Sequence, residues 1–219
     1  MKRCPRERRK SDEKAAKKIH EKIFCAEREP IQPRTIKAHI HQLDRATHGS
    51  MEEARDAIAD DIHKNFWDEE LQSFVQYKGA KVVDAAILLM PLVRFISPTD
   101  PKWLSTLAVI ERELTVDTFV YRYRYVDGFD GLTGDEGSFT ACCFWFIEAL
   151  ARSHQTAKAR LLLEKMLGYA NHVGLYAEEL STSGHHLGNF PQALTHLALI
   201  SAATYLDRKL SGTEHVAWG

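Results

Sequence analysis

The chain has 219 residues, of which 44% are hydrophobic and 27% are charged, so it can bury a folded core. Its net charge of −1 provides no global attraction for nucleic acid or an anionic membrane surface. No apolar run approaches the roughly 20 residues of a membrane-spanning helix, and the charged N-terminus lacks the apolar run of a signal peptide. We therefore expect a cytoplasmic protein with neither a nucleic acid nor a membrane as partner.

Residues 1–45 form a polar, basic segment that we expect to be a disordered or loosely helical tail. Lysine and arginine are dense in residues 1–22, and a nucleic-acid-binding arm is the functional alternative. This segment lacks the interleaved aromatic residues of such an arm. We expect one folded domain over residues 46–210 and a frayed tail over 211–219.

Helices of two kinds are predicted in the first part of the domain. Residues 50–67 have apolar positions at helical spacing and predict an amphipathic helix, and a loop or short extended piece follows to residue 81. Residues 82–96 are apolar nearly all round, which predicts a buried helix that Pro91 ends or kinks. Residues 102–115 predict a second amphipathic helix.

The same order of patterns recurs further along the chain. Residues 116–137 predict a short strand followed by a long loop, because β-branched and aromatic residues give way to Gly and Asp. Residues 138–153 are apolar on nearly every face and predict a buried helix, and residues 155–173 predict an amphipathic one. These two helices repeat the pairing of a buried with an amphipathic helix.

The last predicted helix opens near Asn189, a plausible N-cap, with Pro191 in its first turn, where a missing N–H is tolerated. Its apolar positions recur at helical spacing and predict a buried face: Phe190, Leu194, Leu197 and Ile200. Glu178 and Glu179 lie on the loop that feeds this helix. A hydrolase that needs a fixed general base would place a carboxylate in this way, although a solvated surface pair is the alternative from these residues alone.

None of the four cysteines forms the C-x-x-C pair of a zinc site or a thioredoxin-like redox motif. Adjacent Cys142 and Cys143 lie in an apolar run, which favours small buried side chains. His185 and His186 lack partners at metal-ligand spacing, so solvated loop histidines are the simpler interpretation. The sequence therefore predicts neither a metal site nor a cofactor.

The order of elements favours an all-α fold, an α/α toroid. In residues 66–113 and 121–172, and again from residue 174, a loop leads into an almost wholly apolar helix and an amphipathic helix returns. In a toroid the inner helices are buried on all sides, and the loops that lead into them gather at one rim. No short repeat of fixed period is visible, so a helical-repeat solenoid is the second choice.

The motifs from Phe66 to Leu206 resemble glycoside hydrolase family 15, the glucoamylase-like family with bacterial trehalase-like members. The most specific pieces are GDEGSF with CFWFIEAL, and GLYAEEL with GNFPQALTHLALI. The resemblance implies the C-terminal half of the catalytic domain, a partial (α/α)6 six-hairpin toroid of about three helical hairpins. It also implies hydrolysis of α-glucosidic bonds with inversion, in maltose-type oligosaccharides, starch fragments or trehalose.

The resemblance further implies roles for charged residues. Such enzymes use one carboxylic acid to protonate the leaving oxygen and one carboxylate to activate a water molecule. Glu178 matches the position of the general base, with Glu179 as the reserve. Arg122 matches an arginine that donates hydrogen bonds to sugar hydroxyls, which its planar guanidinium suits; a surface arginine is the alternative.

Four more residues are weighed as sugar contacts, for an oligosaccharide or disaccharide substrate. Glu136 precedes an inner helix, where it either binds a sugar hydroxyl or favours the helix dipole. Trp67 and Tyr77 lie in a rim loop and are weaker candidates for a sugar platform. Trp145 is interpreted as core, because its helix is apolar on nearly every face.

The general acid of the family has no counterpart here. In the family it lies upstream in a Trp-Glu motif, and Trp-Glu occurs nowhere in this chain. We therefore expect a truncated member that keeps the base, lacks the acid and is weak or inactive alone. The alternative is a non-catalytic remnant or a subunit of a split enzyme. Such a helical interaction module would bind a missing N-terminal half-protein or self-associate through the exposed apolar flank of residues 82–93.

Overall fold

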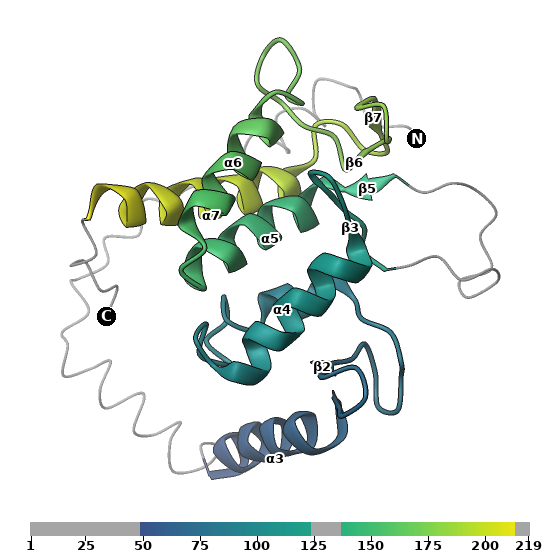
Figure 1. The fold of residues 1–219 in the computed structure, drawn as a ribbon, viewed down its shortest axis with the longest axis vertical. Helices are drawn as coiled ribbons and strands as arrows, with labels where there is room; N and C mark the ends of the chain where they lie inside the picture. Colours follow the sequence, from purple (N-terminus) through teal and green to yellow (C-terminus); the bar gives the residue numbers. More distant parts are fainter. Residues whose placement is uncertain (1–48, 124–136, 213–219) are drawn as a thin grey trace, which may run out of the picture. The chain divides into compact units, whose positions relative to one another are not determined.

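Figure 1 shows the computed structural model of the chain, which describes residues 49–123 and 137–212. The expected basic tail, Glu136 in the long loop and most of the expected C-terminal tail lie outside these residues. The chain divides into two compact units, residues 1–56 and 57–219. The domain boundaries expected from the sequence stay predictions.

Helices dominate the described residues, as an all-α toroid requires. The α-helices of this part of the chain are α3 (Gly49–Asn65), α4 (Pro101–Leu114), α5 (Thr140–Arg152), α6 (Thr156–Leu167) and α7 (Ala193–Ser211). They are accompanied by one 3-10 helix, η2 (Ala85–Leu89), and by strands of two residues each. None of the described helices is long and apolar enough to cross a membrane.

The predicted amphipathic helix over residues 50–67 is confirmed as α3, and a short hairpin follows it directly. Strand β1 (Trp67–Asp68) pairs antiparallel with β2 (Ser73–Phe74). The backbone N–H of Phe74 donates to the Thr106 hydroxyl at 3.1 Å, so this hairpin is tied to α4.

The predicted helix over residues 82–96 is wrong in type and in length. The chain forms the short 3-10 helix η2 and then a series of turns. Asp84 is the N-cap, its carboxylate accepting from the Ala86 N–H at 2.6 Å, and the Met90 N–H donates to the carbonyl three residues before it. Pro91 has no N–H with which to extend the helix, which explains why regular structure ends there.

The predicted amphipathic helix over residues 102–115 is confirmed as α4. Asp100 caps it by accepting from the Lys102 N–H at 2.8 Å, and a proline occupies the first helical position. Trp103 is fully buried, and its indole N–H donates to the Ser153 hydroxyl at 3.0 Å. This bond links the start of α4 to the end of α5.

A second hairpin follows α4 and confirms the short strand predicted there. Strand β3 (Thr115–Val116) pairs antiparallel with β4 (Phe119–Val120). The Tyr121 N–H then donates to the Leu114 carbonyl at 2.9 Å. The hairpin returns the chain to the core just before Arg122.

Helix α5 is the centre of the core, as predicted for residues 138–153. All its residues except Trp145 and Arg152 are buried. Helices α6 and α7 pack against it (Figure 1), and so does η2. Helix α6 buries one side only, through Ala159, Leu162 and Met166. This pairing of a helix buried on nearly every face with an amphipathic one is the inner and outer order of a toroid.

Helix α7 corrects two expectations. It begins at Ala193 rather than near Asn189, and Gln192 is the N-cap, its side chain accepting from the Leu194 N–H. Its buried side carries Thr195, Ala198, Ala202 and Leu206. The four apolar side chains predicted to be buried are instead 48–64% exposed: Phe190, Leu194, Leu197 and Ile200. The helix therefore presents an apolar face that no described residue covers.

A small antiparallel sheet places the two carboxylates beside the start of α5. Strand β6 (Glu179–Leu180) is central, with β5 (Ser138–Phe139) on one side and β7 (His186–Leu187) on the other. The polar, glycine-containing turn between β6 and β7 belongs to the loop that feeds the last predicted helix. It thus joins two strands of a sheet that braces the N-terminus of the central helix.

Candidate active site

A cavity of about 320 Å³ lies where η2, α5 and α7 meet the residue before β6. Glu178 and Arg122, two of the predicted site residues, both line it. Its remaining lining residues are Ala86, Phe139, Ala141, Cys142, Trp145, Gln192, Leu194 and Thr195. The tertiary structure therefore brings together two charged residues that lie far apart in the sequence.

Glu178 is held by hydrogen bonds along its backbone and at its carboxylate. Its N–H donates to the Asn189 carbonyl at 2.9 Å, and its own carbonyl accepts from the Thr140 N–H at 2.9 Å. Carboxylate oxygen Oε2 accepts from the Asn189 backbone N–H at 3.1 Å and from the Asn189 side-chain amide at 2.7 Å. These contacts tie one oxygen to the residue that follows β7 and orient the side chain.

Gly188 lets the backbone pass close to this carboxylate. Its φ is +70°, a left-handed conformation, and a Cβ at this position would lie 3.0 Å from Glu178 Oε2 and 3.1 Å from Glu178 Cβ. Any side chain here would therefore displace the carboxylate or the loop. Gly188 could not be singled out from its neighbours in the sequence, because only the folded loop shows which residue it faces.

Glu179 has a different environment. It belongs to strand β6, where successive side chains point to opposite faces, and it does not line the cavity. Its Oε2 accepts from the Gly137 N–H at 3.0 Å. A Cβ on Gly137 would lie 2.7 Å from the Leu180 carbonyl oxygen, so the chain passes β6 very closely there. Glu179 thus fixes the entry to β5.

Arg122 reaches the cavity from the segment after β4. Its side chain is 53% exposed, and its Nε lies 3.8 Å from Asp84 Oδ2. Its backbone carbonyl accepts from the Ala85 N–H at 2.7 Å. The backbone of Arg122 is therefore tied to the start of η2, while much of its guanidinium stays accessible.

Of the aromatic residues weighed as sugar contacts, Trp145 lines the cavity, whereas Trp67 and Tyr77 do not. Trp145 is the half-buried residue of an otherwise buried stretch of α5, and it lines the cavity. Trp67 packs edge-on against Phe74 at a centroid distance of 5.3 Å, and Tyr77 is 48% exposed. Neither Trp67 nor Tyr77 lines the cavity of Glu178. The exposed edge of Trp145 could not be inferred from a helix that is apolar on nearly every face.

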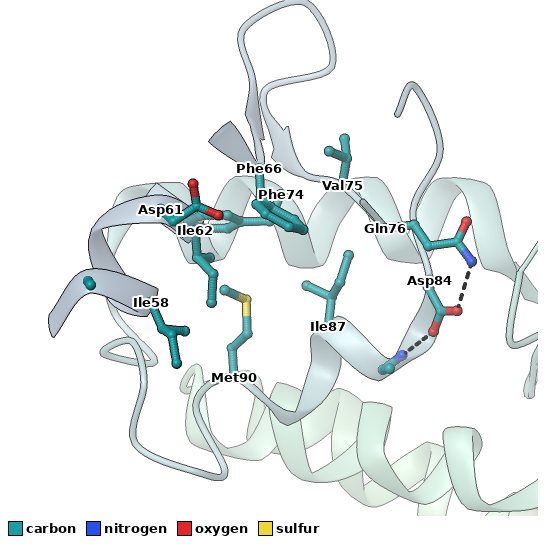
Figure 2. Close-up of a pocket in the computed structure, with 12 residues that line it drawn as sticks. Ile58, Asp61, Ile62, Phe66, Phe74, Val75, Gln76, Asp84, Ile87 and Met90 are labelled. Atoms are coloured by element: carbon teal, nitrogen blue, oxygen red, sulfur yellow. Dashed lines mark hydrogen bonds between the residues drawn. The ribbon is translucent and has the colours of Figure 1, made fainter. Parts of the chain in front are cut away.

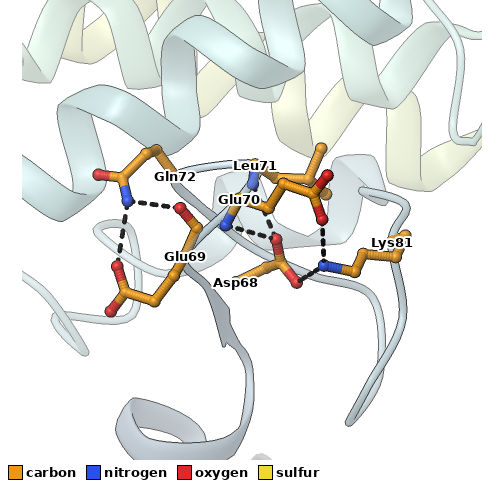
Figure 3. Close-up of polar contacts among 6 residues, drawn as sticks. All are labelled: Asp68, Glu69, Glu70, Leu71, Gln72 and Lys81. Carbon is orange, nitrogen blue, oxygen red and sulfur yellow. Dashed lines mark hydrogen bonds and ion pairs between the residues drawn. The ribbon is translucent and has the colours of Figure 1, made fainter.

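The turn beside Trp67 is a self-contained polar cluster. Asp68 accepts from the backbone N–H groups of Glu70 and Leu71 at 3.0 and 2.7 Å, and Lys81 reaches both Asp68 and Glu70 (Figure 3). The hydrogen bond from Lys81 is the main reason that the pKa of Asp68 is lowered. The charges of this turn are thus engaged with one another.

Cys142 and Cys143 are free and buried, as expected for small core side chains. Burial raises the pKa of the Cys142 thiol far above its usual range and that of Cys143 to about 11. A thiol acts as a nucleophile only as the thiolate. Cys142 therefore contributes a neutral side chain to the wall of the cavity. No three His, Cys, Asp or Glu side chains gather at a metal-binding spacing within the described ranges.

A larger groove of about 650 Å³ lies between α3, β2 and η2 (Figure 2). Apolar side chains of these elements and of the residues that directly follow α3 and η2 form most of its wall: Ile58, Ile62, Phe66, Phe74, Ile87 and Met90. Asp84 and Gln76 lie at one end of it, joined by a hydrogen bond of 3.3 Å (Figure 2). Ala86 lines both the groove and the cavity of Glu178, so the two are neighbours.

Solved glycosidases share the arrangement of these helices. One glycosidase variant superposes with a TM-score of 0.61 at 18% identity, over 74% of this chain and 46% of that chain. A wild-type glycosidase gives a TM-score of 0.56 at 19% identity, over 76% and 46%. At identities this low, the similarity supports a shared fold and nothing further. The chain is thus a partial α/α toroid of the glycosidase kind.

Relatives of known sequence share more identical residues with the chain than these solved structures do. The family model described as glycosyl hydrolases family 15 matches residues 36–204, so the chain belongs to this family. The trehalase of Thermoplasma volcanium is 47% identical over 157 residues, which are 71% of this chain and 25% of that protein. The trehalase of Mycobacterium tuberculosis is 45% identical over 156 residues, 69% and 23%. The chain spans about a quarter of the length of these curated relatives.

Proposed function

We propose that this chain carries the water-activating half of a glycoside hydrolase site that acts on the α-glucosidic bonds of trehalose, with inversion. The relatives named trehalase support this disaccharide over maltose-type oligosaccharides and starch fragments. One solved glycosidase of the same fold is described as a complex with glucose. The single observation that carries the proposal is that Glu178 and Arg122 line one cavity.

Glu178 is the proposed general base. An inverting site holds its base and its acid roughly 6.5–9.5 Å apart, with the attacking water beside the base. Oε2 of Glu178 is engaged by Asn189, so we assign proton abstraction to Oε1. Arg122 would donate hydrogen bonds to sugar hydroxyls, because its guanidinium offers several donors in one plane. Glu179, bonded to Gly137 outside the cavity, is the less suitable base.

The general acid is the part that we propose to be missing. Among the described residues that line the cavity, Glu178 is the sole carboxylate. The sequence also lacks the Trp-Glu motif of the family acid. Loss of a general acid typically costs about 10²–10⁴-fold in rate. The chain alone should therefore hydrolyse trehalose poorly, even if water activation is intact.

A substrate that needs no acid tests this proposal directly. Fluoride leaves α-D-glucosyl fluoride without being protonated, so a site that retains only its base can still hydrolyse it. We expect the full chain to release fluoride at a rate that Glu178→Gln abolishes and Glu179→Gln retains, with little glucose released from trehalose by any of the three. Equal fluoride release by the native chain and Glu178→Gln would show that Glu178 is not the base.

A second candidate function is that of a non-catalytic interaction module, either a remnant or a subunit of a split enzyme. The exposed apolar face of α7 favours it, since exposed apolar patches mark association sites. The partner would be a missing N-terminal half-protein or a second copy of this chain. Absence of any glucosyl fluoride hydrolysis, combined with self-association or binding to a separately expressed N-terminal half, would support this function over the first.

A further inference from the structure

We propose that Asp84 is the residue that positions the Arg122 guanidinium for sugar binding; the sugar contact itself rests on the proposed function. Asp84 lies at the N-terminus of η2 and at one end of the apolar groove (Figure 2), and its ion-pair partner Arg122 lines the cavity of Glu178. The residue is 7% exposed, whereas the Arg122 side chain is 53% exposed. A nearly buried carboxylate is thus paired with a half-exposed cation that lines the cavity.

The two oxygens of Asp84 have separate partners. Oδ1 accepts from the Ala86 N–H at 2.6 Å and caps η2. Oδ2 lies 3.3 Å from Gln76 Nε2 and 3.8 Å from Arg122 Nε. The carbonyl of Arg122 also accepts from the Ala85 N–H, the residue next to Asp84. The start of η2 and the segment after β4 are therefore joined once through their backbones and once through their side chains.

Capping alone does not require a charge at this position. Ser, Thr, Asn and Asp all cap helices about equally well, because each offers an oxygen to the free N–H groups. Burying a carboxylate is costly unless a cation or several donors compensate it. Among the described residues the cation beside Asp84 is Arg122, which together with the Ala86 N–H and the Gln76 amide compensates the carboxylate.

The ion pair is suited to orientation rather than to stability. Pairs with a half-exposed partner contribute little to the free energy of unfolding, because solvent screens them. A free arginine side chain, however, must lose much rotamer freedom when it binds a sugar. An arginine that is already restrained by Asp84 loses less on binding, so the effect should appear in sugar affinity.

Asp84→Asn is the informative variant, since it keeps an oxygen for the Ala86 N–H and removes the charge. Asp100→Asn is its matched control, because Asp100 caps α4 through the same kind of contact, to the Lys102 N–H at 2.8 Å. Calorimetric titration of each full-length variant with trehalose and with glucose measures affinity. We expect Asp84→Asn to weaken binding roughly three- to tenfold and Asp100→Asn to leave it unchanged.

A double-mutant cycle separates positioning from a general structural effect. In an Arg122→Gln background, Asp84→Asn should cause no further loss of affinity, because the group that it positions is absent. An equal loss with and without Arg122 would overturn the proposal. The thermal midpoints of Asp84→Asn and Asp100→Asn should change little and by similar amounts, since asparagine caps a helix about as well as aspartate.

The Arg122 Nε–Hε signal in nuclear magnetic resonance tests the positioning without any sugar. In the native chain and in Asp100→Asn the heteronuclear Overhauser effect of this N–H should show a restrained side chain, because the ion pair limits its motion, and in Asp84→Asn the restraint should be reduced. An unchanged effect in Asp84→Asn would overturn the inference. If the native chain binds neither sugar, the proposed function fails, and this signal still decides whether Asp84 restrains Arg122.

Discussion

Asn189 donates two hydrogen bonds to a single oxygen of Glu178, one from its backbone N–H and one from its side-chain amide. The Glu178 N–H in turn donates to the Asn189 carbonyl. Two residues on opposite sides of the β6–β7 hairpin thus hold one another through backbone and side chain. The orientation of the proposed base is set by this reciprocal contact rather than by burial.

Asn189→Ala should lower the rate of glucosyl fluoride hydrolysis by about ten- to a hundredfold, because the Glu178 carboxylate would no longer be held in position to accept a proton from the attacking water. The free energy of unfolding should fall by about 1.5–3 kcal/mol, the contribution of one hydrogen bond to a charged group. Ser183→Ala, in the same hairpin but bonded to Ser181 and His185, is the control that should retain the rate. Equal rates for Asn189→Ala and the native chain would contradict this role.

Gly188→Ala should impair both folding and the site. Its positive φ alone costs about 1 kcal/mol in the free energy of unfolding, and the new Cβ would also press on the Glu178 carboxylate. Gly79→Ala separates the two effects, because Gly79 has φ +78° with nothing within 4 Å of a Cβ. Urea unfolding should show both variants destabilised, and only Gly188→Ala should lose hydrolysis of glucosyl fluoride.

The exposed face of α7 should drive association. Leu197 and Ile200 are 64% and 61% exposed, so replacing both with Glu should leave the fold intact and reduce self-association in sedimentation velocity. Ala202→Glu places a charge on the buried side of the same helix and should unfold the chain. A native chain that stays monomeric at high concentration, with unchanged behaviour in the double Glu variant, would exclude self-association through this face.

Arg152→Ala should be strongly destabilising. The Arg152 guanidinium bonds Glu148 Oε1 at 2.6 Å and stacks over the Tyr205 ring of α7 at 4.2 Å, while the Glu148 side chain is 1% exposed. Removing the arginine leaves a buried carboxylate without its cation, which costs about 3–5 kcal/mol. Replacing Glu148 by Gln in the same variant should recover part of this loss in chemical denaturation. No recovery would show that the arginine acts by packing alone.

Stability should fall in alkali because of Cys143. Burial raises its thiol pKa from 9.0 to about 11, so between these values the unfolded chain has released a proton that the folded chain retains. The unfolded state then binds fewer protons, and the free energy of unfolding decreases with rising pH, by at most about 1.4 kcal/mol per pH unit for this group. Cys143→Ala should show a shallower decrease between pH 9 and 11 in urea titrations. An identical slope would assign the effect to other groups.

Much of the fold was predictable because it depends on local pattern. Helices α4 and α6 lie where the periodicity of their apolar residues predicts them, and α5 lies where an almost wholly apolar run predicts a buried helix. The Asp100 cap is likewise a local feature. Neighbouring residues determine such features, since caps and helical spacing act within a few positions. The 3-10 form of η2 was not predictable, because an apolar run indicates that a helix is buried but not whether its backbone hydrogen bonds follow the α or the 3-10 pattern.

The sequence by itself determined the all-α class, the family and the presence of two candidate carboxylates, Glu178 and Glu179. Only the tertiary structure decided which of them lines a cavity with Arg122, because Glu178 precedes β6 and is held by Asn189, whereas Glu179 lies in β6, whose register is set by distant partners. It also decided that Asp84 pairs with Arg122 and that one side of α7 is exposed. These features arise between segments far apart in the chain, where spacing along the sequence carries no information on distance.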